Sequence, residues 1–229
     1  MTVLVIPFLT GQDALRRCID SIAPGIDVLV IDNSDGGVVD IDLRGWFLSM
    51  PHNLGVAASW NLGIKSYPHE PYWLFANHDT VLAPGDLDRL IAEMEKGGPR
   101  WVGMNGDWRV MGLTREAVET VGFFDENYHP IYCEDVDYER RCTLAGVPWY
   151  FIEGGATHVG SASIRDPRYA KANQRTYPAN VAYHVAKWGG PPRGGERFTT
   201  PFDSGASVRE WTLDLSRLRD LSWDRDGKP

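Results

Sequence analysis

Two acidic clusters contain the residue types in this chain that are best suited to chemistry. The first, Asn77 to Asp79, lies where the apolar run 72–76 ends, and the second, Glu134 to Asp137, opens a segment with helical spacing. A carboxylate at the end of a buried strand is well placed to bind a metal ion or a substrate. A second acidic pair from another element can supply a general base. The two clusters together suit the transfer of a group from a phosphorylated donor.

Each cluster also has an ordinary structural interpretation. Asp79 could be a turn carboxylate that caps the next helix, because a Pro-Gly turn signal follows it. Glu134 and Asp135 could simply be acids that the dipole favours in the first turn of a helix. Pairing of Asp137 with Arg141, four residues further on, would occupy one carboxylate and leave Asp135 available as a base.

Further candidates follow other predicted strands. The dipeptide Pro7-Phe8 and Asp32 end two apolar runs, and ligands of a parallel sheet bind beyond the carboxyl ends of its strands. Asp32 is either a turn residue or a hydrogen-bond acceptor for a nucleobase. Asn53 and Gly55 open a helix whose free N–H groups would favour a phosphate. His158, among glycines, is either structural or a ligand that reaches a Mn²⁺–diphosphate.

The elements that must position these residues alternate in an α/β pattern. Apolar runs predict the strands, and helical spacing predicts the helices, with Thr10 as the expected cap of the first helix. Strands are predicted at 2–6, 28–31, 72–76 and 148–152, and helices at 14–22, 56–65, 87–94, 115–121 and 134–145. The first strand, helix and strand form a βαβ unit, which predicts a mostly parallel sheet flanked by helices.

After about Ser163 the sequence becomes more polar, and a helical C-terminal extension is predicted over 166–229. The segment 208–221 places its apolar residues on one helical face. Such a face packs either on its own domain or on a second subunit. A homodimer formed through this helix is therefore one possible assembly.

Composition narrows the class of protein. The chain has 229 residues, 43% of them hydrophobic, which is enough for one sizeable core. Its net charge of −8 argues against a nucleic-acid-binding protein. No apolar stretch reaches the length of a transmembrane segment, and the apolar start lacks the basic region of a signal peptide. Three cysteines without a CxxC pair favour a reducing, cytoplasmic location.

Taken in order, these segments resemble the GT-A-fold glycosyltransferases of the family numbered two, particularly their rhamnosyltransferase-like branch. The resemblance covers roughly residues 2 to 165. It is carried by Val3-Leu4-Val5-Ile6-Pro7, Val30-Ile31-Asp32-Asn33-Ser34, Asn53-Leu54-Gly55-Val56-Ala57, Asn77-His78-Asp79, Val121-Gly122-Phe123-Phe124-Asp125-Glu126, Glu134-Asp135-Val136-Asp137 and His158-Val159-Gly160-Ser161. Their shared order and spacing make the set specific.

The resemblance implies a GT-A domain at 1–165, with a nucleotide-sugar half at about 1–100 and an acceptor half at about 101–165. It also implies an inverting, metal-assisted transfer from a nucleoside-diphosphate sugar to an acceptor hydroxyl. Asp135 matches the catalytic base and Glu134 the residue that orients the acceptor, while Asp79 and His158 match ligands of Mn²⁺ or Mg²⁺. The residues expected around the nucleotide sugar are Pro7, Phe8, Asp32, Asn53, Gly55 and Asn77. Asn77 departs from the family, because it replaces the first acid of the DxD element and removes one charge.

The same residues also bear on other functions. A non-catalytic carbohydrate- or nucleotide-binding module would agree with Asn77 and with nine tryptophans that could stack on sugars. A sugar-1-phosphate nucleotidyltransferase is disfavoured because no basic, glycine-rich loop follows the first strand, and a nicotinamide-dependent oxidoreductase because GxGxxG is absent there. The acceptor is left open between a glycan, a lipid-linked glycan and a protein.

Overall fold

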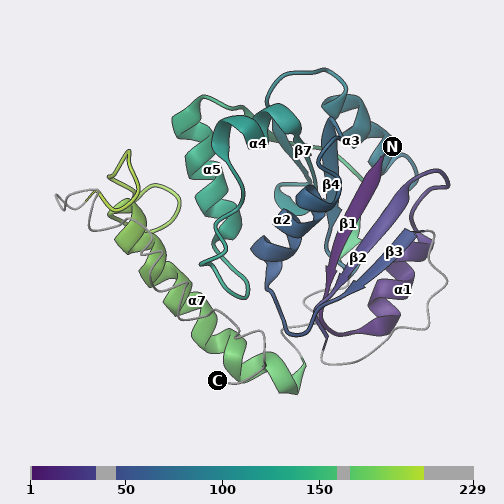
Figure 1. The fold of residues 1–229 in the computed structure, drawn as a ribbon, viewed down its shortest axis with the longest axis horizontal. Helices are drawn as coiled ribbons and strands as arrows, with labels where there is room; N and C mark the ends of the chain where they lie inside the picture. The colour runs from purple at the N-terminus through teal and green to yellow at the C-terminus, as the bar shows by residue number, and fades with distance from the viewer. Residues whose placement is uncertain (1, 35–44, 159–165, 204–229) are drawn as a thin grey trace, which may run out of the picture.

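The computed structural model describes residues 2–34, 45–158 and 166–203, with a seven-stranded sheet at its centre (Figure 1). The strand order is β3-β2-β1-β4-β7-β6-β8. The strands are β1 (Val3–Phe8), β2 (Asp27–Asp32), β3 (Gly45–Ser49), β4 (Tyr72–Ala76), β6 (Trp101–Met104), β7 (Asp107–Thr114) and β8 (Trp149–Ile152). Only β7 runs antiparallel to its neighbours, β4 and β6, so the predicted mostly parallel sheet is confirmed.

Helices cover both faces of this sheet (Figure 1). They are α1 (Gln12–Asp20), α2 (Val56–Ser66), α3 (Asp86–Met94), α4 (Arg115–Val121), α5 (Glu134–Ala145) and α7 (Pro167–Trp188). Apolar side chains of α1 and α3 pack in one core cluster, and those of α2, α4 and α5 pack in a second. Residues of β1 alternate between the two clusters, which explains why this strand is apolar at consecutive positions.

The structure differs from the predicted elements in one helix cap and in three additional strands of the main sheet. Thr10 does not cap α1, because the N-cap is Gly11 in a left-handed conformation (φ 87°), and the Thr10 hydroxyl donates to Asp166 instead. Strands β3, β6 and β7 were not predicted. All five residues of β3 are exposed at the sheet edge, and its apolar run, Trp46 to Leu48, is only three residues long. Gly112 interrupts the apolar run in the sequence of β7, and an added Cβ there would lie 2.7 Å from the Met94 sulfur of α3.

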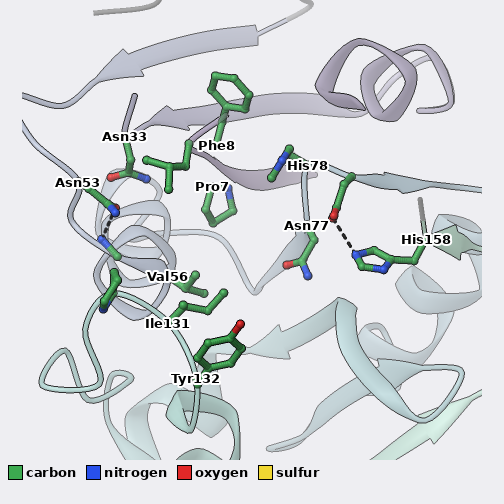
Figure 2. Close-up of a pocket in the computed structure, with 14 residues that line it drawn as sticks. Pro7, Phe8, Asn33, Asn53, Val56, Asn77, His78, Ile131, Tyr132 and His158 are labelled. Atoms are coloured by element: carbon green, nitrogen blue, oxygen red, sulfur yellow. Dashed lines mark hydrogen bonds and ion pairs between the residues drawn. The ribbon is translucent and has the colours of Figure 1, made fainter. Parts of the chain in front are cut away.

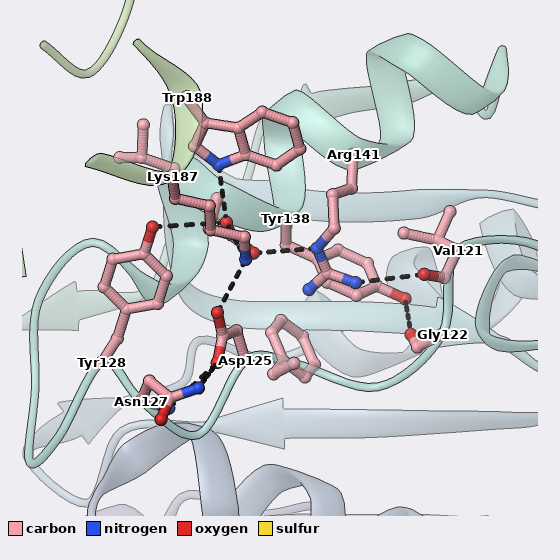
Figure 3. A network of polar contacts seen from close by, with 12 residues as sticks. Val121, Gly122, Asp125, Asn127, Tyr128, Tyr138, Arg141, Lys187 and Trp188 are labelled. Atoms are coloured by element: carbon pink, nitrogen blue, oxygen red, sulfur yellow. Dashed lines mark hydrogen bonds and ion pairs between the residues drawn. The ribbon is translucent and has the colours of Figure 1, made fainter. Parts of the chain in front are cut away.

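The C-terminal helix α7 packs against the rest of the chain through a buried polar network (Figure 3). The Lys187 ammonium lies 2.6 Å from carboxylate oxygens of both Asp125 and Asp137. The Trp188 indole N–H donates to the same Asp137, which also accepts from Arg141. The predicted helix 208–221, and the dimer expected through it, lie outside the described residues. Within the described ranges, no helix is both long and apolar enough to cross a membrane.

Candidate functional site

The carboxyl ends of β1, β2 and β4 meet at one edge of the sheet and open onto a cavity of about 260 Å³ (Figure 2). Its wall is formed by strand ends, by the start of α2 and by the turn before α5. The lining residues are Pro7, Phe8, Leu9, Asn33, Asn53, Gly55, Val56, Asn77, His78, Asp79, Pro130, Ile131, Tyr132 and His158. The sequence candidates Pro7, Phe8, Asn53, Gly55 and Asn77 therefore share one cavity. We call it the first cavity.

A small two-stranded sheet brings Asp79 and His158 together. β5 (Thr80–Val81) pairs antiparallel with β9 (Thr157–His158), and Thr80 is the register partner of His158. The His158 Nε2 atom lies 2.9 Å from the Asp79 carboxylate, which is almost completely buried (Figure 2). Two residues far apart in the sequence thus place a carboxylate oxygen and an imidazole nitrogen side by side on the cavity wall.

This donor pair is chemically suited to a divalent metal such as Mn²⁺, which accepts carboxylate and imidazole ligands. In the described part of the chain, no group of three or more His, Cys, Asp and Glu side chains is positioned to hold a metal ion. A metal bound at Asp79 and His158 would therefore need other ligands, such as donor phosphates, water or the amide of Asn77. The residues present fit a metal that binds together with its substrate.

The two other residues of the Asn77–Asp79 cluster also lie at the cavity. The Asn77 backbone N–H donates to the Arg109 carbonyl of β7, which fixes this residue at the end of β4. Burial lowers the pKa of His78, although the nearby Asp79 charge acts in the opposite direction. The His78 ring packs edge-on against Phe8, so a neutral imidazole forms part of the apolar wall.

Asp32 and the start of α2 are placed differently from the sequence expectation. Asp32 is buried beside the cavity rather than among its lining residues, and its Oδ1 accepts from the Ser34 N–H and hydroxyl. At the start of α2, three successive N–H groups already have protein acceptors: Leu54 donates to the Asn33 amide oxygen, Gly55 to Asn53, and Val56 to the Pro130 carbonyl. These three donors are therefore not available for a phosphate.

A second cavity, of about 270 Å³, adjoins the first. It is lined by Val56, Trp60, Asn77, Asp107, Trp108, Arg109, Ile131, Glu134, Asp135 and His158. Four of these residues, Val56, Asn77, Ile131 and His158, also line the first cavity. The two acidic clusters of the sequence, Asn77 to Asp79 and Glu134 to Asp137, therefore contribute residues to adjoining cavities.

The carboxylates of Glu134 and Asp135 differ in their surroundings. Burial, followed by the charge of Asp135, raises the pKa of Glu134, and the Glu134 Oε2 atom is buried without a hydrogen-bond partner. Asp135 is only partly buried, and its Oδ1 accepts from the Val136 N–H. Burial raises the pKa of Asp135 too, while that N–H and the Arg193 charge oppose the rise. Because the Asp135 charge adds to the effect of burial on the pKa of Glu134, Glu134 is the more weakly acidic carboxyl of this pair.

The other acid of the second cluster has a structural role. The predicted pairing of Asp137 with Arg141 is present, at 2.8 Å between Nε and Oδ2. Asp137 is fully buried and also bound by Lys187 and Trp188, so it anchors α7 and does not face either cavity. Of the acids in this cluster, Glu134 and Asp135 line the second cavity.

Aromatic residues divide between the core and the site. Trp101 and Trp108 stack on each other in the core, at 3.4 Å between ring centroids, and Tyr128 is fully buried. Trp108 additionally lines the second cavity, and Tyr132 lines the first. Pro130 and Ile131, which precede Tyr132 in the same turn, were missed as part of the site, because only their proximity to Glu134 in the sequence could have indicated them.

Comparison with known proteins gives a family match over most of this fold. The model of the family described as "Glycosyl transferase family 2" matches residues 3–144, which is more than half of the chain. A galactofuranosyl glycosyltransferase of Leishmania donovani is 31% identical over 151 residues, covering 51% of this chain and 34% of that protein. The chain therefore spans about a third of the length of this curated relative.

Solved structures with the same fold are distant in sequence. TarS of S. aureus superposes with a TM-score of 0.54 at 12% identity, covering 67% of this chain and 35% of TarS. GalNAc-T7, solved with UDP, GalNAc and Mn²⁺, superposes with a TM-score of 0.59 at 12% identity, covering 82% of this chain and 50% of that one. These similarities confirm the predicted GT-A type of fold.

Proposed function

The chain belongs to glycosyl transferase family 2, and we propose that it moves a sugar from a nucleoside-diphosphate sugar to an acceptor hydroxyl with inversion. The observation that supports this proposal most directly is the pair of adjoining cavities. The first is lined by strand ends and by the Asp79–His158 pair, and the second by Glu134 and Asp135. A donor in the first cavity and an acceptor in the second would meet at the residues that both cavities share.

In this proposal Asp135 takes the proton from the acceptor hydroxyl as its oxygen attacks the anomeric carbon. Asp135 suits the role because it is partly exposed to the second cavity and has one oxygen that is not used by the Val136 N–H. Glu134, held mainly in its neutral form, would donate a hydrogen bond to the acceptor or keep one of its hydroxyls in place. The two carboxyl groups thus divide the base and positioning roles.

Asp79 and His158 would hold a divalent metal, Mn²⁺ or Mg²⁺, together with the donor. Such a metal stabilises the negative charge of the departing diphosphate. The presence of Mn²⁺ and UDP in the structure of GalNAc-T7 supports this part of the proposal by analogy. Asn77 lines both cavities and contributes an amide where the family has an acid, so metal binding would depend more strongly on the donor phosphates.

The transferred sugar is proposed to be a hexose. The name of the Leishmania relative makes galactofuranose one donor to test, and the rhamnosyltransferase-like resemblance makes rhamnose another. A soluble glycan, a lipid-linked glycan and a protein are the acceptor classes to compare. A cytoplasmic location stays a prediction.

The proposal is tested by thermal shift and by transfer assays. Nucleoside diphosphates should stabilise the protein, more strongly with Mn²⁺ than with a chelator. Asp135→Asn should lower the transfer rate by about 10²- to 10⁴-fold while the nucleotide-induced shift is retained. Asp88→Asn is the matched control, because Asp88 is an exposed acid in the first turn of α3. Nucleotide binding by the wild type without transfer to any acceptor class would instead support a non-catalytic binding module. No stabilisation by any nucleotide would refute the transferase proposal.

A further inference from the structure

The turn that precedes α5 has an unusual backbone. Tyr132 and Cys133 are consecutive non-glycine residues with left-handed backbones, at φ 85° and φ 72°. Cys133 is the N-cap of α5, so this conformation sets the direction in which the helix begins. It also places Tyr132 on the wall of the first cavity and Glu134 on the wall of the second. Such strained residues persist only where surrounding contacts hold them.

Two side chains of α7 contact this turn. The Asn180 side-chain amide donates to the Ile131 carbonyl and to the Tyr132 carbonyl, both at 2.9 Å. Asn180 is only 4% exposed, so its two N–H groups are committed to these carbonyls and not to water. One turn earlier on α7, the Tyr177 ring packs edge-on against the Tyr132 ring.

Helix α7, which carries Asn180, is itself bound to α5. Lys187 and Trp188, near the end of α7, both bind Asp137 of α5 (Figure 3). Asn180 therefore acts from a helix that is anchored on the same element that Glu134 and Asp135 open. The family model ends at residue 144, so this support comes from a part of the chain beyond the family match.

From these contacts we infer that Asn180 is a positioning residue, which holds the Ile131–Cys133 turn so that Glu134 and Asp135 face the second cavity. The inference rests on the proposed function. Asn180 lines neither cavity, so it acts through the turn and does not contact a substrate. Of the residues that line the first cavity, Asn180 hydrogen-bonds only Ile131 and Tyr132, and it makes no hydrogen bond with the strand ends that form most of that cavity. Nucleotide binding should therefore be affected much less than transfer when Asn180 is substituted.

The test replaces Asn180 with aspartate, which has nearly the same size and shape. The side-chain NH₂ group that donates to the two carbonyls is thereby replaced by a carboxylate oxygen, which can only accept hydrogen bonds. Gln174→Glu is the matched control, because it makes the same amide-to-acid change at an exposed position of α7. At a temperature where both variants are fully folded, Asn180→Asp should lower kcat by about 10-fold to 100-fold. The dissociation constant of the Asn180→Asp variant for UDP should differ from that of the wild type by less than about threefold. Asn180→Ser, which keeps one donor, replaces Asn180→Asp if the latter does not fold.

Hydrogen exchange of the peptide 130–136 tests the positioning role of Asn180 independently of whether the protein transfers a sugar. Faster exchange there, with unchanged exchange in β1 and β4, is expected for the Asn180 variant and not for Gln174→Glu. Unchanged exchange of this peptide, or an unchanged kcat in a folded variant, would overturn the positioning role. If the wild type transfers no sugar, the proposed function fails, and exchange alone then decides whether Asn180 holds the turn.

Discussion

Replacement of Lys187 by methionine should destabilise the protein strongly. The Lys187 side chain is 6% exposed, and its ammonium lies 2.6 Å from oxygens of both Asp125 and Asp137 (Figure 3). Methionine has a similar length but no charge, so both carboxylates would lose their shared cation. Removing one partner of a buried ion pair typically costs about 3–5 kcal/mol, because the remaining charge stays buried.

The lower end of that range is expected here, because both acids keep other partners. Asp137 still binds Arg141 and Trp188, and Asp125 still accepts from the Tyr183 hydroxyl. A loss of about 3 kcal/mol corresponds to a fall in Tm of about 6–12 °C for a domain of this size.

Denaturant unfolding at pH 7 measures this loss, with Lys96→Met as the matched control. Lys96 forms an exposed ion pair with Glu93, and its side chain is 56% exposed, so its replacement should cost at most about 1 kcal/mol. A Lys187→Met cost no larger than that of Lys96→Met would refute the reasoning.

The pH dependence of stability provides a second test of the Lys187→Met variant. Burial acts to raise the pKa of Asp125, but the Lys187 charge and several hydrogen bonds outweigh it and hold this pKa below its usual range. A carboxyl group with a lowered pKa contributes stability above its unfolded-state pKa of about 3.9, and that contribution is lost as the pH falls through its folded-state value. The stability difference between wild type and Lys187→Met should therefore shrink below about pH 4.

Two further substitutions test the site. The raised pKa of Glu134 means that the folded protein holds this proton more tightly than the unfolded chain, so stability should fall as the pH rises above about 4.3, by up to about 1.4 kcal/mol per pH unit. Glu134→Gln should flatten this slope in unfolding measured at pH 5, 6 and 7, and an unchanged slope would contradict the buried-acid interpretation. Gly55→Ala should cost about 1–3 kcal/mol and weaken nucleotide binding, because φ is +81° and the new Cβ would lie 2.8 Å from the Pro130 carbonyl oxygen. Gly25→Ala has a similar φ of +95° and open space, so equal costs for the two variants would exclude a clash at Gly55.

Some elements were predictable because their signals are local. The helix predicted over 134–145 has those bounds in the structure, since the acids of its first turn and the Gly146 C-cap both act within the helix itself. Helix α4, predicted over 115–121, likewise begins with a local signal, because the Thr114 side chain accepts from the Ala117 N–H. The strands that were missed have weaker signals, because the apolar run of β3 is only three residues long and β7 contains a glycine that its packing against α3 requires.

The gathering of strand-end residues at one edge also followed from the sequence, because parallel strands end at the same side of a sheet. Pro7, Asn53 and Asn77 share the first cavity for this reason. It could not be predicted that the N–H groups at the start of α2 bind acceptors within the protein, because one of these acceptors, the Pro130 carbonyl, comes from a turn far along the chain. The pairing of Asp79 with His158 likewise depends on the contact between β5 and β9.

The sequence by itself determined the α/β class, the main helices and the two acidic clusters. Only the tertiary structure decided what each acid does, because the environment of a carboxylate is set by whatever packs around it. Glu134 and Asp135 line the second cavity, whereas Asp137, less than one helical turn further on, is enclosed by residues of α7. Helical spacing predicts that these side chains point in different directions. It does not predict that one direction meets a cavity and another a buried lysine.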